Sequence, residues 1–175
     1  MNKTAIIALV AVFAIAAVGI GAYTGLFLGD QSLPPGNVTN PGISTFSLME
    51  GPVETIGGKP VIRLFSTTWC SHCQWIKPTF DRVAKEYADA GRIVAYHWEL
   101  DTGDDTLTPE ADGFVPQSEQ DVFAKFNPRN SIPTFVFGGK YYRIGNGFES
   151  EQSLTLEEQE FRAVIEELIK EAQGH

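Results

Sequence analysis

The sequence predicts an α/β fold with a central mixed sheet and helices on both faces, preceded by an N-terminal transmembrane helix. Three observations carry this prediction. Short β-branched and aromatic runs alternate with segments whose apolar residues recur at helical spacing. The 175 residues, 43% of them hydrophobic, suffice for one domain with additional segments. Residues 4–29 contain no charged side chain and therefore stand apart from the rest of the chain.

Composition and charge exclude several classes of protein. With only two cysteines the chain is not a disulfide-dense mini-protein, and with 17 Gly and 12 Phe it is neither collagen nor wholly disordered. A net charge of −9 argues against a phosphate-binding basic surface. We therefore expect no nucleic-acid partner.

Residues 4–29 are long enough to cross the roughly 30 Å hydrocarbon core of a bilayer as one helix. Lys3 precedes this run, so the positive-inside rule keeps the amino terminus in the cytoplasm. We predict a retained anchor over 1–29, because the apolar region of a cleaved signal usually has only about 7–15 residues. A cleaved signal with a secreted domain is the alternative. Both interpretations make the domain extracytoplasmic.

Residues 30–45 are rich in Pro, Gly, Asn and Ser, which is typical of a linker. This segment contains Asn37-Val38-Thr39, an acceptor sequence for N-glycosylation. The folded domain is accordingly predicted over 46–175.

The first half of the domain shows a strand, a helix and a second strand. Residues 60–66 form a short β-branched and aromatic run, which predicts a strand. Apolar residues at helical spacing follow, and this predicted helix contains Pro78 and ends at Gly91. Residues 92–100 are apolar on both faces and predict a central strand.

The second half begins with an acidic insertion at 101–117, predicted to be a surface loop that is either solvated or involved in partner choice. Ser118 and Asp121 are spaced to cap a short helix. Two strands joined by a turn are predicted over 134–137 and 140–144.

The last predicted helix opens with a capping box made by Thr155 and Glu158. Its apolar residues recur at helical spacing and should face the core. They are Phe161, Val164, Ile165, Leu168 and Ile169.

Cys70-Ser71-His72-Cys73 follows the first strand, where the next helix begins. The two-residue gap at a helix N-terminus brings both sulfurs within reach of a disulfide. It also leaves Cys70 beside unpaired N–H groups and the positive end of the helix dipole, which stabilise a reactive thiolate. His72 adds an imidazole that can be cationic. A more stable thiolate makes the disulfide a stronger oxidant.

Two other uses of the cysteine pair agree less well with the sequence. A structural disulfide would close a loop too short to add much stability. A zinc site could take both cysteines and a histidine, but structural zinc usually has four ligands and the chain has no second cysteine pair. We therefore predict a redox-active disulfide between Cys70 and Cys73, with no metal and no cofactor.

Three features together resemble the thioredoxin-fold thiol–disulfide oxidoreductases. They are Trp69 before the motif, Pro78 after it, and Ile132-Pro133-Thr134 before a strand. The similarity covers about residues 53–172 and implies a thioredoxin-like fold.

The resemblance also implies roles for individual residues. Cys70 would be the exposed nucleophile and Cys73 the resolving cysteine. In this family the proline at position 133 is cis and faces the disulfide. The residues implied to dock a substrate peptide are Trp69, Ile132, Pro133 and Gly145.

One departure from the family concerns the proton of the resolving cysteine. Thioredoxins usually carry a buried Asp six positions ahead of the first cysteine, where this chain has Leu64. A proton relay must then come from elsewhere or from water, and His97 and Glu99 on the neighbouring strand are the candidates.

The function we expect is an extracytoplasmic thiol–disulfide oxidoreductase. Its partners would be exported protein thiols and disulfides, a protein that recharges it, and the membrane through residues 4–29. His72 resembles the middle residue of the motif in disulfide isomerases and bacterial disulfide oxidases, which favours oxidase or isomerase over reductase. The alternatives are a redox-inactive peptide-binding module and a dedicated reductant carrier for a single partner.

Overall fold

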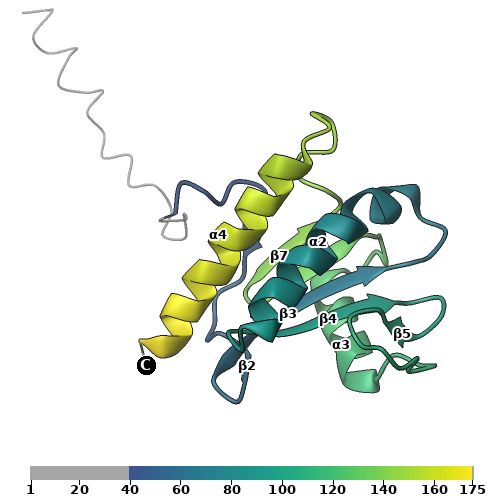
Figure 1. Cartoon of the computed structure of the whole chain (residues 1–175), viewed down its shortest axis with the longest axis horizontal. Helices are drawn as coiled ribbons and strands as arrows, with labels where there is room; N and C mark the ends of the chain where they lie inside the picture. The colour runs from purple at the N-terminus through teal and green to yellow at the C-terminus, as the bar shows by residue number, and fades with distance from the viewer. Residues whose placement is uncertain (1–39, 175) are drawn as a thin grey trace, which may run out of the picture. The chain divides into compact units, whose positions relative to one another are not determined.

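The computed structural model of the chain describes residues 40–174. Its strands are β1 (Ser47–Leu48), β2 (Thr55–Ile56), β3 (Lys59–Ser66), β4 (Val94–Glu99), β5 (Asp104–Asp105), β6 (Thr134–Phe137) and β7 (Tyr141–Ile144). Its helices are α2 (Ser71–Asp89), α3 (Gln117–Phe126) and α4 (Leu154–Gln173). The strands form one mixed sheet in the order β1-β7-β6-β3-β4-β5, and β2 pairs with β3 outside that path (Figure 1).

The central strand is β3, which runs parallel to β4 and antiparallel to β6. All its residues after Lys59 are buried, because both faces of the strand are covered. Arg63 is the charged residue among them. Its guanidinium lies 2.7 Å from both Glu54 and Glu119, and these pairs compensate the burial of its charge. The predicted strand at 60–66 is confirmed.

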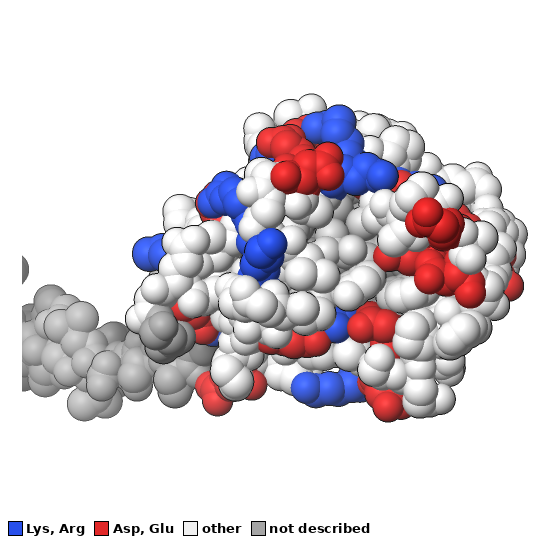
Figure 2. Space-filling view, turned by 60° about the horizontal axis from the view of Figure 1, so that its bottom comes forward, with Lys and Arg blue, Asp and Glu red and all other residues white. Residues whose placement is uncertain are grey.

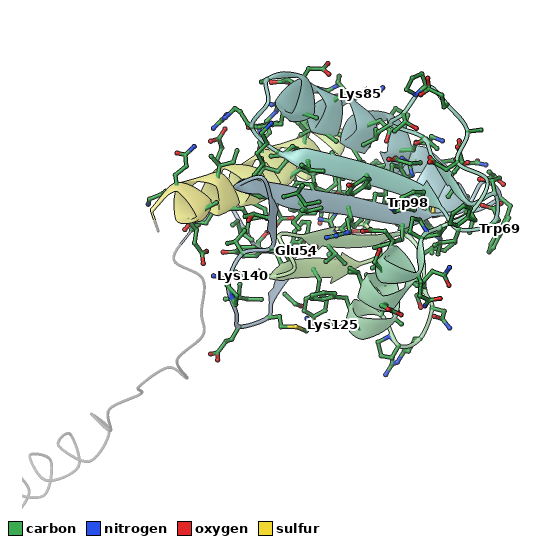
Figure 3. The ribbon with its side chains drawn as sticks, turned by 90° about the horizontal axis from the view of Figure 1, so that it is seen from below. Glu54, Trp69, Lys85, Trp98, Lys125 and Lys140 are labelled. Carbon is green, nitrogen blue, oxygen red and sulfur yellow. The ribbon has the colours of Figure 1, made fainter. Side chains whose placement is uncertain are left out.

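Helices cover both faces of the sheet, as the sequence predicts (Figure 3). Side chains alternate along β3, so Ile62 and Leu64 enter the core that contains residues of α2 and α4. Phe65 points the other way and packs against Phe123 of α3. The thioredoxin-like α/β fold is therefore confirmed.

Both predicted helix caps are wrong, although both helices are present. α4 is capped by Ser153, whose hydroxyl accepts a hydrogen bond from the Leu156 N–H (3.3 Å), and Thr155 lies inside the helix. Glu158 instead pairs with Arg82 of α2. The five apolar residues predicted to face the core are all buried.

α3 begins at Gln117 after Pro116, and its N-terminus has no side-chain cap. Ser118 therefore lies within the first turn. Asp121 accepts a hydrogen bond from the Gln117 side chain (2.9 Å) one turn earlier along the same helix.

β4 is not a central strand, because only the two-residue β5 lies beyond it. The first part of the inserted loop pairs with the edge of β4, whereas residues 108–114 are exposed, as a surface loop is expected to be. The buried Asp105 carboxylate accepts hydrogen bonds from the N–H groups of His97 (2.8 Å) and Leu107 (3.1 Å). The Thr106 N–H donates to the His97 carbonyl (2.9 Å). These bonds extend the sheet edge with the first part of the insertion.

The domain begins before residue 46, inside the predicted linker. Ile43 is buried in the core, and Glu160 of α4 accepts hydrogen bonds from the backbone N–H groups of Ser44 and Thr45. The predicted anchor at 4–29 and the sequon at Asn37 lie outside the described residues. Within 40–174, no helix is long and apolar enough to cross a membrane.

Candidate functional site

The Cys-x-x-Cys motif forms the N-terminus of α2, as predicted. Cys70 is the N-cap residue, with an extended backbone, and its Sγ accepts a hydrogen bond from the Cys73 N–H (3.2 Å). β3 ends at Ser66, so a four-residue turn places this sulfur at the carboxyl end of the central strand. No acidic side chain lies in the first turn of α2, and the positive end of the helix dipole therefore favours negative charge at Cys70.

Both cysteines are thiols, and both are buried. Cys70 is 6% exposed and Cys73 2% exposed, so the residue predicted to be the nucleophile is less exposed than the resemblance implies. The reason is its role as a cap, which draws the sulfur against the end of the helix. Burial, and then the hydrogen bond with Cys70, raise the pKa of Cys73 to about 12. Cys73 therefore stays protonated at neutral pH.

The side chain of His72, within the cysteine motif, is paired with an acidic residue of another loop. Its Nδ1 lies 2.8 Å from Oε1 of Glu149, in the loop between β7 and α4. Asn146 completes the cluster, since its Nδ2 donates to the His72 carbonyl (3.0 Å) and to Glu149 (2.7 Å). Burial would raise the pKa of Glu149, but the hydrogen bonds from Asn146 and His72 outweigh it and hold the pKa below its ordinary value. Sequence reasoning missed Glu149 and Asn146.

A buried ion-pair cluster holds the loop that carries Glu149. Arg143 of β7 pairs with Glu157, and the other oxygen of that carboxylate accepts the Phe148 N–H (2.8 Å). Arg143 also donates from Nε to the Gly145 carbonyl (3.2 Å). Glu157 is fully buried, so the first part of this loop is held at Gly145 and at Phe148 by buried groups.

Two of the implied docking residues come together with this loop. The Ile132–Pro133 peptide bond is cis, and the Pro133 carbonyl accepts a hydrogen bond from the Gly145 N–H (2.8 Å). Gly145 has a φ of +83°, a backbone conformation that glycine adopts without strain. Ile132 is partly buried against the core beside α3. The Asn146 bond to His72 then links this group to the cysteine motif.

Trp69, the fourth residue that the resemblance implies to dock a substrate, is 72% exposed. Figure 3 shows it at the outer edge of the domain, away from the buried Trp98. Its ring is therefore accessible to a partner beside the cysteine motif.

The two relay candidates bind other partners in this structure. His97 is fully buried, with Nε2 2.8 Å from Ser66 Oγ and Nδ1 2.6 Å from Asp81 Oδ1. Glu99 accepts a hydrogen bond from Lys77 (2.6 Å). Within 40–174, no three His, Cys, Asp or Glu side chains are grouped so that they could hold a metal ion.

Comparison with known proteins agrees with the fold. The thioredoxin family model matches residues 53–112, which include both cysteines. Thioredoxin-T of Drosophila melanogaster is 30% identical over 102 residues, or 57% of this chain and 53% of that protein. Bloodstream-specific protein 2 of Trypanosoma brucei brucei is 48% identical over 44 residues, or 25% of this chain and 8% of that protein. The chain thus spans about half, or less, of the curated relatives it matches.

Two solved structures are similar at low identity. Reduced DsbA1 from Neisseria meningitidis aligns over 81% of this chain and 100% of that chain, with a TM-score of 0.47 and 15% identity. The germline-specific thioredoxin Deadhead from Drosophila melanogaster aligns over 59% of this chain and 93% of that chain, with a TM-score of 0.34 and 19% identity.

Proposed function

We propose that this thioredoxin-fold domain is a thiol–disulfide oxidoreductase, with Cys70 as the exchanging cysteine and Cys73 as the resolving cysteine. One observation carries the proposal. The Cys70 sulfur caps α2 and accepts the Cys73 N–H at 3.2 Å, while Cys73 is buried with a pKa of about 12. The two sulfurs are therefore chemically unequal, which favours Cys70 as the sulfur that exchanges with a partner.

Oxidation of a substrate would proceed in two exchanges. A substrate thiolate attacks Cys70 Sγ of the oxidised pair, the Cys70–Cys73 bond breaks, and Cys73 leaves as a thiolate that takes up a proton. A second substrate thiolate then attacks the substrate sulfur of the mixed disulfide and releases Cys70 as a thiolate. The substrate loses two electrons and the cysteine pair gains them. Reduction is the reverse sequence, with the Cys70 thiolate as attacker.

The proton of Cys73 needs an acceptor in the reducing direction. A pKa of about 12 means that this thiol does not ionise by itself at neutral pH. We propose His97 and Glu99 as candidates, because both lie on β4, which is paired with the strand that leads into the motif. A hydrogen bond between Ser66 Oγ and His97 Nε2 (2.8 Å) favours His97 as the relay, because Ser66 is the last residue of β3, before the turn to the motif.

The direction of exchange and the location are also proposals. His72 in the motif supports an oxidase or isomerase, whereas its pairing with Glu149 reduces the positive charge available to Cys70. We propose that the domain acts outside the cytoplasm on exported protein thiols, anchored through residues 4–29 and recharged by another protein. The uncharged length of that segment supports the anchor.

Thiol-exchange assays on the full-length chain test the proposal. Cys70→Ser should abolish insulin reduction and oxidation of a dithiol peptide, and Cys73→Ala should accumulate mixed disulfides. Ser71→Ala, in the same turn, is the matched control and should keep its activity. Full activity in Cys70→Ser would remove that residue from the mechanism.

The trapped species and the potential separate the alternatives. No exchange by the wild type would favour a redox-inactive peptide-binding module. A single protein trapped by Cys73→Ala would favour a dedicated carrier, and many would favour a general catalyst. A Cys70–Cys73 potential near −120 to −180 mV supports an oxidase or isomerase, and one near about −270 mV a reductase.

A further inference from the structure

We propose that a hollow between the inserted loop and α3 binds a partner polypeptide that carries an apolar side chain beside basic residues. The proposal rests on the function proposed above, since it names the kind of substrate that the cysteine motif would meet. Four observations support it. They are the residues that line the hollow, the hydrogen bond that joins it to the cysteine motif, the bonds that hold the loop, and the acidic charge around it.

The hollow has a volume of about 530 Å³, enough for a few side chains. Its apolar lining comes from both sides. Leu100 directly precedes the insertion and Val115 lies near its end, whereas Phe123 and Ala124 belong to α3. Phe114 also lines it and is 71% exposed. An exposed aromatic side chain at the rim of an apolar hollow marks an interaction site better than a scattered surface residue does.

The hollow adjoins the cysteine motif through Asp101. This residue lines the hollow, and its carboxylate accepts the Thr68 N–H (3.1 Å), two residues before Cys70. Trp69 lies between Thr68 and Cys70 in the sequence and is 72% exposed. A polypeptide whose cysteine exchanges with Cys70 can therefore place its neighbouring residues in the hollow.

The loop is already held in shape. The Asp105 N–H donates to the Asp112 carboxylate (3.2 Å), and the Asp112 N–H donates to Asp104 (3.0 Å). Gly103 has a φ of +77° and lies so close to Phe114 that a Cβ on it would be 2.5 Å from the Phe114 Cα. A binding surface that is formed in advance loses little conformational entropy when a ligand binds.

The acidic charge around the hollow favours a basic peptide as its occupant. From 101 to 124 there are seven acidic residues and neither Lys nor Arg. Two of the seven, Asp105 and Glu119, are buried with partners, which leaves five near the surface. They are Asp101, Asp104, Glu110, Asp112 and Asp121. Figure 2 shows acidic atoms gathered at the right of the view with few basic atoms among them. Such a field attracts basic segments and repels acidic ones.

Binding of labelled, cysteine-free peptides to the full-length chain tests the proposal, with fluorescence anisotropy as the readout. One peptide has a Leu-Phe pair between lysines, the second has the same pair between glutamates, and the third has Ala-Ala between lysines. We expect the first to bind at least about tenfold more tightly than either of the others at low salt, with the charge preference falling as salt is added.

Two variants locate the binding. Ala124→Trp fills the hollow from an exposed helix position, and Phe114→Ala removes the rim; each should weaken the first peptide about three- to tenfold. Ser118→Ala, an exposed and uncharged position of α3 that does not line the hollow, is the control. Equal affinity for the three peptides, or unchanged affinity in Ala124→Trp, would overturn the proposal.

Exchange with dithiothreitol is measured in parallel and separates this inference from the proposed function. Normal exchange in Ala124→Trp with weakened peptide binding supports both. Loss of exchange in the wild type overturns the oxidoreductase, whereas the peptide affinities still decide whether the hollow binds.

Discussion

His72 and Glu149 are 77 positions apart in sequence, and their side chains meet with Nδ1 2.8 Å from Oε1. The histidine belongs to the cysteine motif and the glutamate to the loop after β7. A carboxylate in this place partly cancels the positive charge that an imidazolium would offer to the Cys70 thiolate. We therefore expect the site to be less oxidising than the motif alone predicts.

The first prediction is that Glu149→Gln makes the Cys70–Cys73 couple more oxidising. Loss of the carboxylate stabilises the Cys70 thiolate and hence the reduced state. His72 is largely exposed, so we expect a shift of only about 5–20 mV toward less negative potential, the equivalent of a weak surface pair. Equilibration with glutathione redox buffers measures it. Glu151→Gln, an exposed glutamate of the same loop, should leave the potential unchanged. A shift toward more negative potential would contradict this role of Glu149.

The second prediction concerns the two thiols of the reduced protein. Because burial raises the pKa of Cys73 to about 12, only on the order of one Cys73 in ten thousand is ionised at pH 8. Brief treatment with iodoacetamide at pH 8 should therefore modify Cys70 and spare Cys73, as read by peptide mass spectrometry. The same treatment in urea is the control and should modify both. Equal labelling of the folded protein would mean that the two sulfurs are equivalent.

The third prediction applies the same pKa to stability. The pKa of Cys73 is raised from its ordinary value near 9 to about 12, so the unfolded chain releases this proton first as the pH rises. The stabilisation of the reduced protein is thus complete below pH 9 and is lost between pH 9 and about 12. Urea unfolding of reduced wild type should weaken more over this window than that of Cys73→Ala, which shares every other titrating group. Parallel curves for the two proteins would contradict the assignment.

Local pattern was enough to place most of the fold. The β-branched run of β3 and the helical spacing of α4 are set by burial, and both elements lie where the pattern puts them. The cap of α3 was misplaced because that helix begins after Pro116 without a side-chain cap, and the cap of α4 because the segment at 153–158 offers two equivalent signals. Ser153 and Thr155 can each cap a helix. In the structure Ser153 is the cap, and Glu158 pairs with Arg82 of another helix and not with the helix terminus.

In the candidate site too, local relations were predictable from the sequence and tertiary contacts were not. Cys70 and Cys73 are close in sequence, so their relation to the helix terminus follows from spacing alone. Glu149 could not be found, because its contact with His72 depends on how the loop after β7 returns over α2. The packing of the first part of the insertion was not predictable either. An acidic segment with Gly and Pro is typical of a solvated loop, and the hydrogen bond from the His97 N–H to Asp105 depends on the tertiary structure.

The fourth prediction concerns the buried cation beneath the site. The Arg143 guanidinium pairs with Glu157 and Glu160 and lies 4.6 Å from the centre of the Phe135 ring. Arg143→Met keeps the volume but leaves two buried carboxylates without their partner, which should cost about 3–5 kcal/mol of unfolding free energy. Urea denaturation measures the loss. Arg82→Met, which breaks an exposed pair with Glu158, should cost much less, and equal losses would show that burial does not matter here.

The fifth prediction separates backbone strain from packing at two glycines. Gly138 and Gly57 have nearly equal positive φ values, +62° and +59°, so alanine at either position should cost about 1–2 kcal/mol through backbone conformation. Their surroundings differ, because a Cβ on Gly138 would lie 2.6 Å from Leu168 Cδ2 of α4, whereas a Cβ on Gly57 would meet nothing within 4 Å. Gly138→Ala should therefore lose about 1–3 kcal/mol more than Gly57→Ala in urea unfolding. Equal losses would mean that α4 yields at this contact, and that the turn between β6 and β7 does not fix where the helix packs.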